Sequence, residues 1–90
     1  MRFEWDENKR LENIRKHEID FVDAALIFDG PTVENVDTRE DYGEIRWRAL
    51  GQIGNMWLLV AYTIRGDARR IISAWKVDDD GAKRYSKLLS

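Results

Sequence analysis

The sequence predicts a two-layer α+β fold: two N-terminal helices packed on a roughly four-stranded antiparallel sheet, with a short C-terminal helix. Three observations predict it. Apolar residues recur at helical spacing as far as Phe28, they alternate with polar ones after Pro31, and turn sequences separate the later apolar runs. Helices that precede a series of antiparallel strands pack on one face of the sheet. We therefore expect a single domain over residues 1–90.

The first expected helix runs from Glu7 to Lys16. Asp6 precedes it as a candidate N-cap, and basic residues occupy its last turn, where they suit the negative end of the helix dipole. Its apolar stripe is thin, so the helix should lie at the edge of the core. Residues 3–5 alternate between apolar and polar and form a short strand at most.

The second expected helix begins at Asp20 and ends at Gly30-Pro31, because proline has no N–H to donate and disfavours helix in the residue before it. Asp23 follows the N-cap by three residues and forms an approximate capping box. Four apolar residues at helical spacing make this the better-buried helix: Phe21, Ala24, Ala25 and Phe28.

Four strands and a last helix follow. The expected ranges are 32–36, 44–53, 56–64 and 69–77 for the strands and about 81–89 for the helix, which Asp78-Asp79-Asp80 opens. Gly54-Asn55 fits a two-residue hairpin loop, and Arg65-Gly66-Asp67 forms a second turn. Residues 56–64 are apolar on both faces, as in a central strand.

The net charge of −2 conceals an uneven distribution. Residues 1–44 carry 6 basic and 13 acidic side chains, whereas residues 45–90 carry 9 basic and 4 acidic ones. This asymmetry predicts a basic side that attracts a polyanion, and nucleic acid is the obvious one. The absence of cysteine excludes a disulfide framework. The longest apolar run, residues 56–62, is too short to span a membrane, so we expect a cytoplasmic protein.

Arginines gather around the last turn. Arg65, Arg69 and Arg70 flank it, and a hairpin fixes their relative positions better than a flexible tail does. A guanidinium is always ionised and presents a planar fork of donors that matches phosphate. The alternative interpretation is that these side chains only keep the tip of a hairpin soluble.

Alternation along the strands brings further cations to one face. If the helices cover the face that bears Trp47 and Trp75, then the opposite face carries Arg46, Arg48, Arg70 and Lys76, with Arg65 at its rim. Such a face suits a single strand of nucleic acid, and we include Arg69 and Trp75 among the candidate RNA contacts. Trp75 can equally belong to the core. A register slip of one residue would invert the whole assignment.

Cleavage of an internal RNA phosphodiester by its own 2′-hydroxyl needs a base, an acid and cations for the transition state. We expect Arg65 and Arg70 to stabilise the phosphate. His17 is the only histidine and is a candidate for proton transfer, although a histidine at a helix end also serves as a dipole partner. Lys9 is a further catalytic candidate, and Glu44 and Asp67 also remain open.

Acidic clusters offer a metal alternative. The aspartates at residues 78–80, or Asp37 with Glu40 and Asp41, could supply oxygen ligands for Mg²⁺. Aspartates at a helix start are more often caps and dipole partners. We therefore expect no metal and no cofactor.

Three stretches together resemble one known family. They are Phe3-Glu4-Trp5-Asp6 with Lys9, Asn13, Lys16 and His17; Phe21, Ala24, Phe28 and Asp29 before Pro31; and Glu44 to Trp47 through Gly51, with Thr63, Arg65 to Asp67 and Arg70 to Ala74. The combination resembles the BrnT family of type II toxins, ribonucleases with a RelE-like fold, over nearly the whole chain. The resemblance implies a toxin that cuts RNA and inhibits translation. It also implies a cognate ribbon-helix-helix antitoxin, with a homodimer or a toxin–antitoxin heterotetramer as the assembly.

The chain departs from that family's pattern at several positions. Glu18 follows His17 where glycine is usual, and Arg69 stands where an apolar residue is usual. Trp75 replaces a usual arginine and is followed by Lys76, which could act as a point charge but lacks bidentate geometry. The C-terminal helix also carries fewer arginines than is usual.

The sequence thus predicts a metal-independent endoribonuclease. A non-catalytic module that binds nucleic acid or protein in regulation is the alternative, because no general base is evident.

Overall fold

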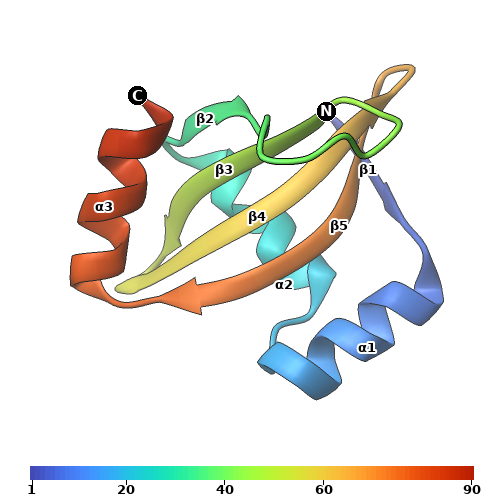
Figure 1. Ribbon diagram of the computed structural model, residues 1–90. Helices are drawn as coiled ribbons and strands as arrows, with labels where there is room; N and C mark the ends of the chain where they lie inside the picture. Colours follow the sequence, from blue (N-terminus) through green and yellow to red (C-terminus); the bar gives the residue numbers. More distant parts are fainter.

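A computed structural model of the protein describes residues 1–90. Its elements are β1 (Arg2–Trp5), α1 (Glu7–His17), α2 (Phe21–Ala24), the 3₁₀ helix η1 (Ala25–Asp29), β2 (Val33–Val36), β3 (Arg46–Ile53), β4 (Met56–Arg65), β5 (Ala68–Val77) and α3 (Asp79–Leu89). The strands form one sheet in the order β1-β5-β4-β3-β2 (Figure 1). Strands β2 to β5 are antiparallel, as expected. The α+β class is confirmed.

The expected four-stranded antiparallel sheet was wrong, because the short N-terminal segment is a fifth strand. β1 pairs in parallel with β5, with Glu4 beside Arg70. This pairing joins the N-terminal segment to a strand in the last third of the chain. A local pattern of alternation indicates a strand but says nothing of a partner more than sixty residues away.

Local hydrogen bonds fix both ends of α1. The Asp6 side chain accepts from the Lys9 N–H at 3.1 Å, which is the expected N-cap. The helix ends at His17, and Glu18 takes a left-handed conformation with φ of 60° while its N–H donates to the Ile14 carbonyl. That conformation favours glycine.

The second helix differs from the expected one. Only α2 is α-helical, and the chain then tightens into η1. A 3₁₀ helix has three residues per turn, so positions three apart share a face. Phe21, Ala24 and Ile27 have this spacing and are fully buried, whereas Phe28, expected to be part of the stripe, is half-buried.

The expected two-layer arrangement was also wrong, because helices pack on both faces of the sheet. β4 is apolar on both sides: Leu58 and Val60 join the cluster under α2 and η1, whereas Leu59 joins a smaller cluster under α3. We call these the back and the front face. In Figure 1, α2 lies behind the sheet, α3 stands at one end, and no helix crosses the middle of the front.

A β-bulge in β5 changes which residues face the front. Ser73 pairs with Ala61 and Ile71 pairs with Tyr62, so Ile72 is the extra residue. Both Ile71 and Ala74 therefore face the back cluster. The expected register is inverted beyond this point.

Candidate nucleic-acid interface

Two rows of residues cross the front of the sheet beyond α3. One row reads Glu4, Arg70, Thr63 and Arg46 from β1 to β3, and the next reads Ser73, Ala61, Arg48 and Asn35 from β5 to β2. Adjacent strands lie about 4.8 Å apart, so the backbones of Arg46 and Arg70 are about 10 Å apart. Small side chains separate the arginines. We call this surface the open face; it comprises Glu4, Arg46, Arg48, Ala61, Thr63, Arg70 and Ser73.

Two of its arginines are held by carboxylates. The Arg46 Nε donates to Glu44 Oε2 at 3.0 Å, and its guanidinium lies 4.3 Å from the centre of the Tyr42 ring. The Arg70 Nη1 donates to Glu4 Oε2 at 2.7 Å. The side chains of Arg46 and Arg70 are each 27% exposed. A guanidinium has five N–H donors, so neither carboxylate exhausts its arginine.

Arg48 differs from both neighbours because it makes no salt bridge. Its Nε is buried and has no hydrogen-bond partner. The side chain extends from β3 on the same face as Arg46, two residues away. A half-buried guanidinium without a protein counter-ion is the group on this face best suited to an anion from outside.

Arg65 lies at the rim of the open face. It follows Thr63 by two residues in β4, at the hairpin tip, and is exposed without a salt bridge. It borders a hollow of about 510 Å³ whose other lining residues include Glu44, Ile45 and Trp47. An anion bound there would meet an exposed cation.

Lys76 does not join the open face, contrary to the expectation, and neither does Arg69, a further candidate RNA contact. Arg69 lies on the back, with its guanidinium 4.0 Å from the centre of the Phe28 ring and Nη2 3.6 Å from Glu34 Oε1. Burial, followed by the hydrogen bond to Glu34, raises the pKa of the neighbouring Tyr62 hydroxyl. Lys76 pairs with Leu58, a back-face residue, because of the bulge at Ile72.

The two α1 candidates line a separate cleft beside the open face. Lys9, Lys16 and His17 border it from α1, and Ile72 and Ser73 border it from β5, in a volume of about 220 Å³; Glu12 and Asn13 complete its lining. Because Ser73 also belongs to the open face, the cleft and that face adjoin.

Lys9 and His17 contribute to the cleft from different turns of α1. They stand eight residues apart in α1, which corresponds to about 12 Å along a helix. The His17 ring lies 6.1 Å from the Trp75 ring. Trp75 is half-buried against the apolar cluster under α3, so part of its ring belongs to the core.

Glu4 and Ser73 were missed as site residues. The alternation of Phe3, Glu4 and Trp5 does separate the glutamate from two inward aromatic residues. Its position beside Arg70 depends on parallel pairing, which has no local signal. Ser73 reaches the open face only because of the bulge.

The acidic clusters form local bonds. Asp78 Oδ1 accepts from the Gly81 N–H at 2.6 Å at the start of α3. Asp37 accepts from Arg39 and from the Tyr42 hydroxyl. No three His, Cys, Asp or Glu side chains come close enough together to hold a metal ion.

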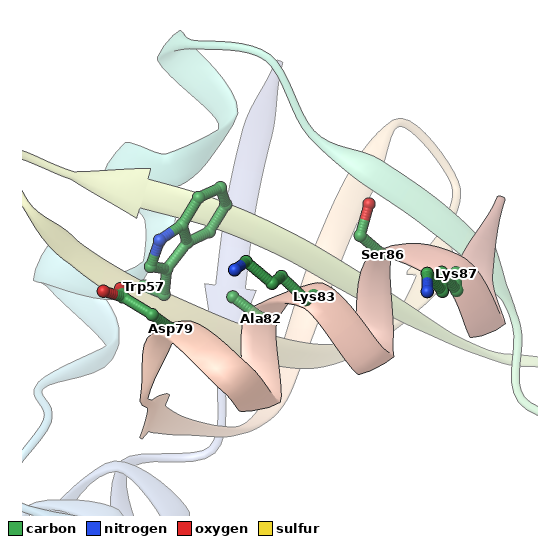
Figure 2. Close-up of a pocket in the computed structure, with 6 residues that line it drawn as sticks. All are labelled: Trp57, Asp79, Ala82, Lys83, Ser86 and Lys87. Carbon is green, nitrogen blue, oxygen red and sulfur yellow. The ribbon is translucent and has the colours of Figure 1, made fainter.

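A further hollow of about 450 Å³ lies on the other end of the front, beside α3. Figure 2 shows Lys83 and Lys87 on the helix and the Trp57 ring on the strand beneath; Asp79, Ala82 and Ser86 complete the lining. Trp57 and Arg65 are at opposite ends of β4, so this hollow is remote from the hairpin tip.

Comparison with known proteins identifies the family. The model of the BrnT ribonuclease toxin of type II toxin–antitoxin systems matches residues 5–80, which include all three arginines of the open face and the α1 cleft. A search of the curated proteins found no match. None of the helices has the length and apolarity needed to cross a membrane. With its mixed sheet and three α-helices, the chain belongs to the BrnT family of ribonuclease toxins of type II toxin–antitoxin systems.

Proposed function

We propose that the protein is a metal-independent endoribonuclease that binds single-stranded RNA across the open face and inhibits translation in the cytoplasm. The observation that carries the proposal is the position of Arg48. This unpaired guanidinium stands among small side chains, with Arg46 beside it on the same strand and Arg70 two strands away. A polyphosphate backbone supplies the anions that these partly desolvated cations lack.

The proposed chemistry is attack of the ribose 2′-hydroxyl on the adjacent phosphorus. Arg48 and Arg70 orient the phosphodiester and stabilise the charge of the five-coordinate transition state, and Arg65 binds the strand at the rim. A preorganised donor of this kind typically contributes about 10²–10³ in rate. One of the two cleft candidates, Lys9 or His17, protonates the departing 5′-oxygen, and the other contacts a neighbouring nucleotide.

A type II toxin family implies a protein antitoxin. We propose that the cognate antitoxin is a ribbon-helix-helix protein that neutralises the toxin by covering the open face. Carboxylates of the antitoxin would then replace RNA phosphates on Arg48. The complex is a heterotetramer in this proposal.

RNA cleavage by the purified protein in EDTA tests the proposal. We expect Arg70→Ala and Arg48→Ala each to slow cleavage by about 10²-fold or more, and Arg65→Ala to slow it less because that side chain is exposed at the rim. Arg84→Ala is the matched control, since Arg84 is an exposed arginine on α3 that makes no salt bridge. Circular dichroism of each variant verifies folding.

Expression in growing cells separates the enzyme from a non-catalytic binding module. An endoribonuclease halts protein synthesis and fragments RNA, and co-expression of the antitoxin reverses both effects. A folded protein that binds RNA in vitro but leaves RNA intact and growth normal would establish the binding module instead. Cleavage that EDTA abolishes and Mg²⁺ restores would contradict metal independence.

A further inference from the structure

Two consecutive arginines of β5 each pair with a glutamate, on opposite faces of the sheet. On the back, the Arg69–Glu34 pair lies against Phe28 and Tyr62, and Tyr62 also donates its hydroxyl hydrogen to Glu34. That pair is partly buried beneath aromatic rings, with the side chains of Arg69 and Glu34 19% and 23% exposed. On the front, the pair of Arg70 with Glu4 has no aromatic cover and stands at the border of the open face.

From this difference we infer that the Glu4 carboxylate is the general base of the reaction and takes the proton of the attacking 2′-hydroxyl. The inference rests on the proposed function, because it concerns the same site and the same RNA substrate. Glu4 lies one residue before the stretch that the family model matches.

The position of Glu4 relative to Arg70 supports the assignment. The Glu4 side chain is 29% exposed, so it is accessible from the front but only partly hydrated. Arg70 uses Nη1 for Glu4 and makes no other hydrogen bond. A phosphate on the remaining edge of this planar group therefore lies beside the carboxylate, and the ribose 2′-oxygen next to the phosphorus comes between them.

The charged groups around Glu4 come from two strands. Arg70 of β5 contacts Oε2, and Arg2 of β1 lies 3.8 Å from Oε1 while it also bonds Asp67. Both cations therefore lie beside the position proposed for the reacting phosphate. They stabilise the anionic phosphorane that forms next to the carboxylate.

The other carboxylates near the site are less well placed. Asp67 is 82% exposed at the turn and bonds Arg2. Glu44 lies in the loop before β3 and bonds Arg46, which is two strands from Arg70. Glu12 bonds two cations of its own helix, Arg15 and Lys16. Glu4 is the only one of these carboxylates that pairs with Arg70, which stabilises the phosphate in the proposed function.

The 2′-oxygen forms a bond to phosphorus and its proton moves to a Glu4 carboxylate oxygen. The P–O5′ bond breaks, its electron pair stays on O5′, and that oxygen takes a proton from the acid of the α1 cleft. The products are a 2′,3′-cyclic phosphate and a 5′-hydroxyl, and no cofactor or redox partner takes part.

Glu4→Gln tests the assignment, because glutamine keeps the shape and can still accept from Arg70 but is not a base. We expect kcat to fall by at least about 100-fold, as for loss of a general base, while affinity for uncleavable 2′-O-methyl RNA stays unchanged or rises. The acidic limb of the wild-type pH–rate profile should disappear. Glu7→Gln is the control: it breaks another glutamate–arginine pair, with Arg10 of α1, and should cut RNA normally.

The outcomes separate the inference from the proposed function. If the wild type cuts RNA and Glu4→Gln cuts equally well, the role of Glu4 is wrong and the nuclease assignment stands. If the wild type does not cut RNA, both the role of Glu4 and the nuclease assignment are wrong. If Glu4→Gln loses RNA affinity by the same factor as it loses rate, and its pH–rate profile keeps the acidic limb, then Glu4 only positions Arg70. That result would overturn the inference.

If Glu4→Gln does not fold, Glu4→Asp carries the test, since it keeps the charge but shortens the reach of the carboxylate. Slower cleavage that keeps the acidic limb supports the inference. Turnover and a pH profile equal to those of the wild type overturn it.

Discussion

The side chain of Asn13 replaces a strand at the edge of β5. Its Nδ2 donates to the Ala74 carbonyl at 2.8 Å, and its Oδ1 accepts from the Ala74 N–H at 3.1 Å. Strand β1 pairs with β5 only as far as Ile71, so Ala74 lies beyond the end of that pairing. The carboxamide therefore completes the hydrogen bonds of the edge and fixes α1 against the sheet, with Lys9 and His17 beside Ser73.

Asn13→Ala should lower the free energy of unfolding by about 2–4 kcal/mol, because it leaves both polar groups of Ala74 and the carbonyl of Ile19 without a partner in a buried place. Urea denaturation measures the loss. Asn8→Ala, on an exposed turn of the same helix, should change stability by less than about 0.5 kcal/mol. Equal stabilities of the two variants would refute the bridging role.

Glu18→Gly should raise the free energy of unfolding by about 1 kcal/mol, because the residue after α1 has a φ of 60° that costs an L side chain energy and glycine almost none. Thermal or urea unfolding detects the gain. Lys16→Gly, inside the same helix, should lower stability by about 1 kcal/mol. If Glu18→Gly also lowers the free energy of unfolding, the glutamate side chain, and not the backbone conformation, determines stability at this position.

Asp37 should make stability fall in acid. The hydrogen bonds from Arg39, followed by those from Tyr42, hold the pKa of this buried carboxyl well below its usual range, despite burial, which opposes the shift. A lowered native pKa contributes stability above the unfolded value of about 3.9 and loses it as pH falls toward the native value.

Urea unfolding at pH 3 to 7 checks the effect of Asp37. The stability difference between the wild type and Asp37→Asn should be constant above about pH 5 and shrink below about pH 4. Asp29→Asn, which removes an exposed carboxylate without a hydrogen bond, should follow the wild-type curve. Curves for Asp37→Asn and the wild type that stay parallel down to pH 3 would rule out the linkage.

Arg48→Ala should reduce the salt dependence of RNA binding. Each phosphate contact on a single strand contributes about −0.7 to the slope of log K against log salt concentration, so the slope should become less steep by about that amount. Titrations of uncleavable 2′-O-methyl RNA at several salt concentrations measure it. Arg84→Ala should keep the wild-type slope, and an unchanged slope in Arg48→Ala as well would remove Arg48 from the interface.

Elements with local causes could be predicted from the sequence. Asp6 and Asp78 cap their helices as expected, and the Gly54-Asn55 hairpin lies where its turn chemistry places it. Alternation along β3 correctly put Arg46 and Arg48 opposite Trp47. The 3₁₀ winding of η1 was not predictable in this way, because Ala24, Ala25, Ile27 and Phe28 satisfy both a period of 3.6 and a period of three.

The placement of cations on β5 could be predicted only in part. Arg70 faces the front as alternation requires, whereas Lys76 faces the back because one extra residue at Ile72 shifts the alternation. The sequence around Ile72 contains no glycine or other residue that would indicate a bulge. The bulge forms because Ile71 and Ala74 both gain by burial against the back cluster.

By itself, the sequence determined α1, α3, the hairpins and the unbroken alternation of β3, because each depends on neighbours within a few residues and on one period. Tertiary structure alone decided that Glu4 meets Arg70, that Arg48 lacks a counter-ion and that α3 leaves the middle of the front uncovered. Those relations join residues far apart in the chain. The free energy that stabilises these contacts comes from burial and strand pairing, and both exist only after the five strands have assembled into the sheet.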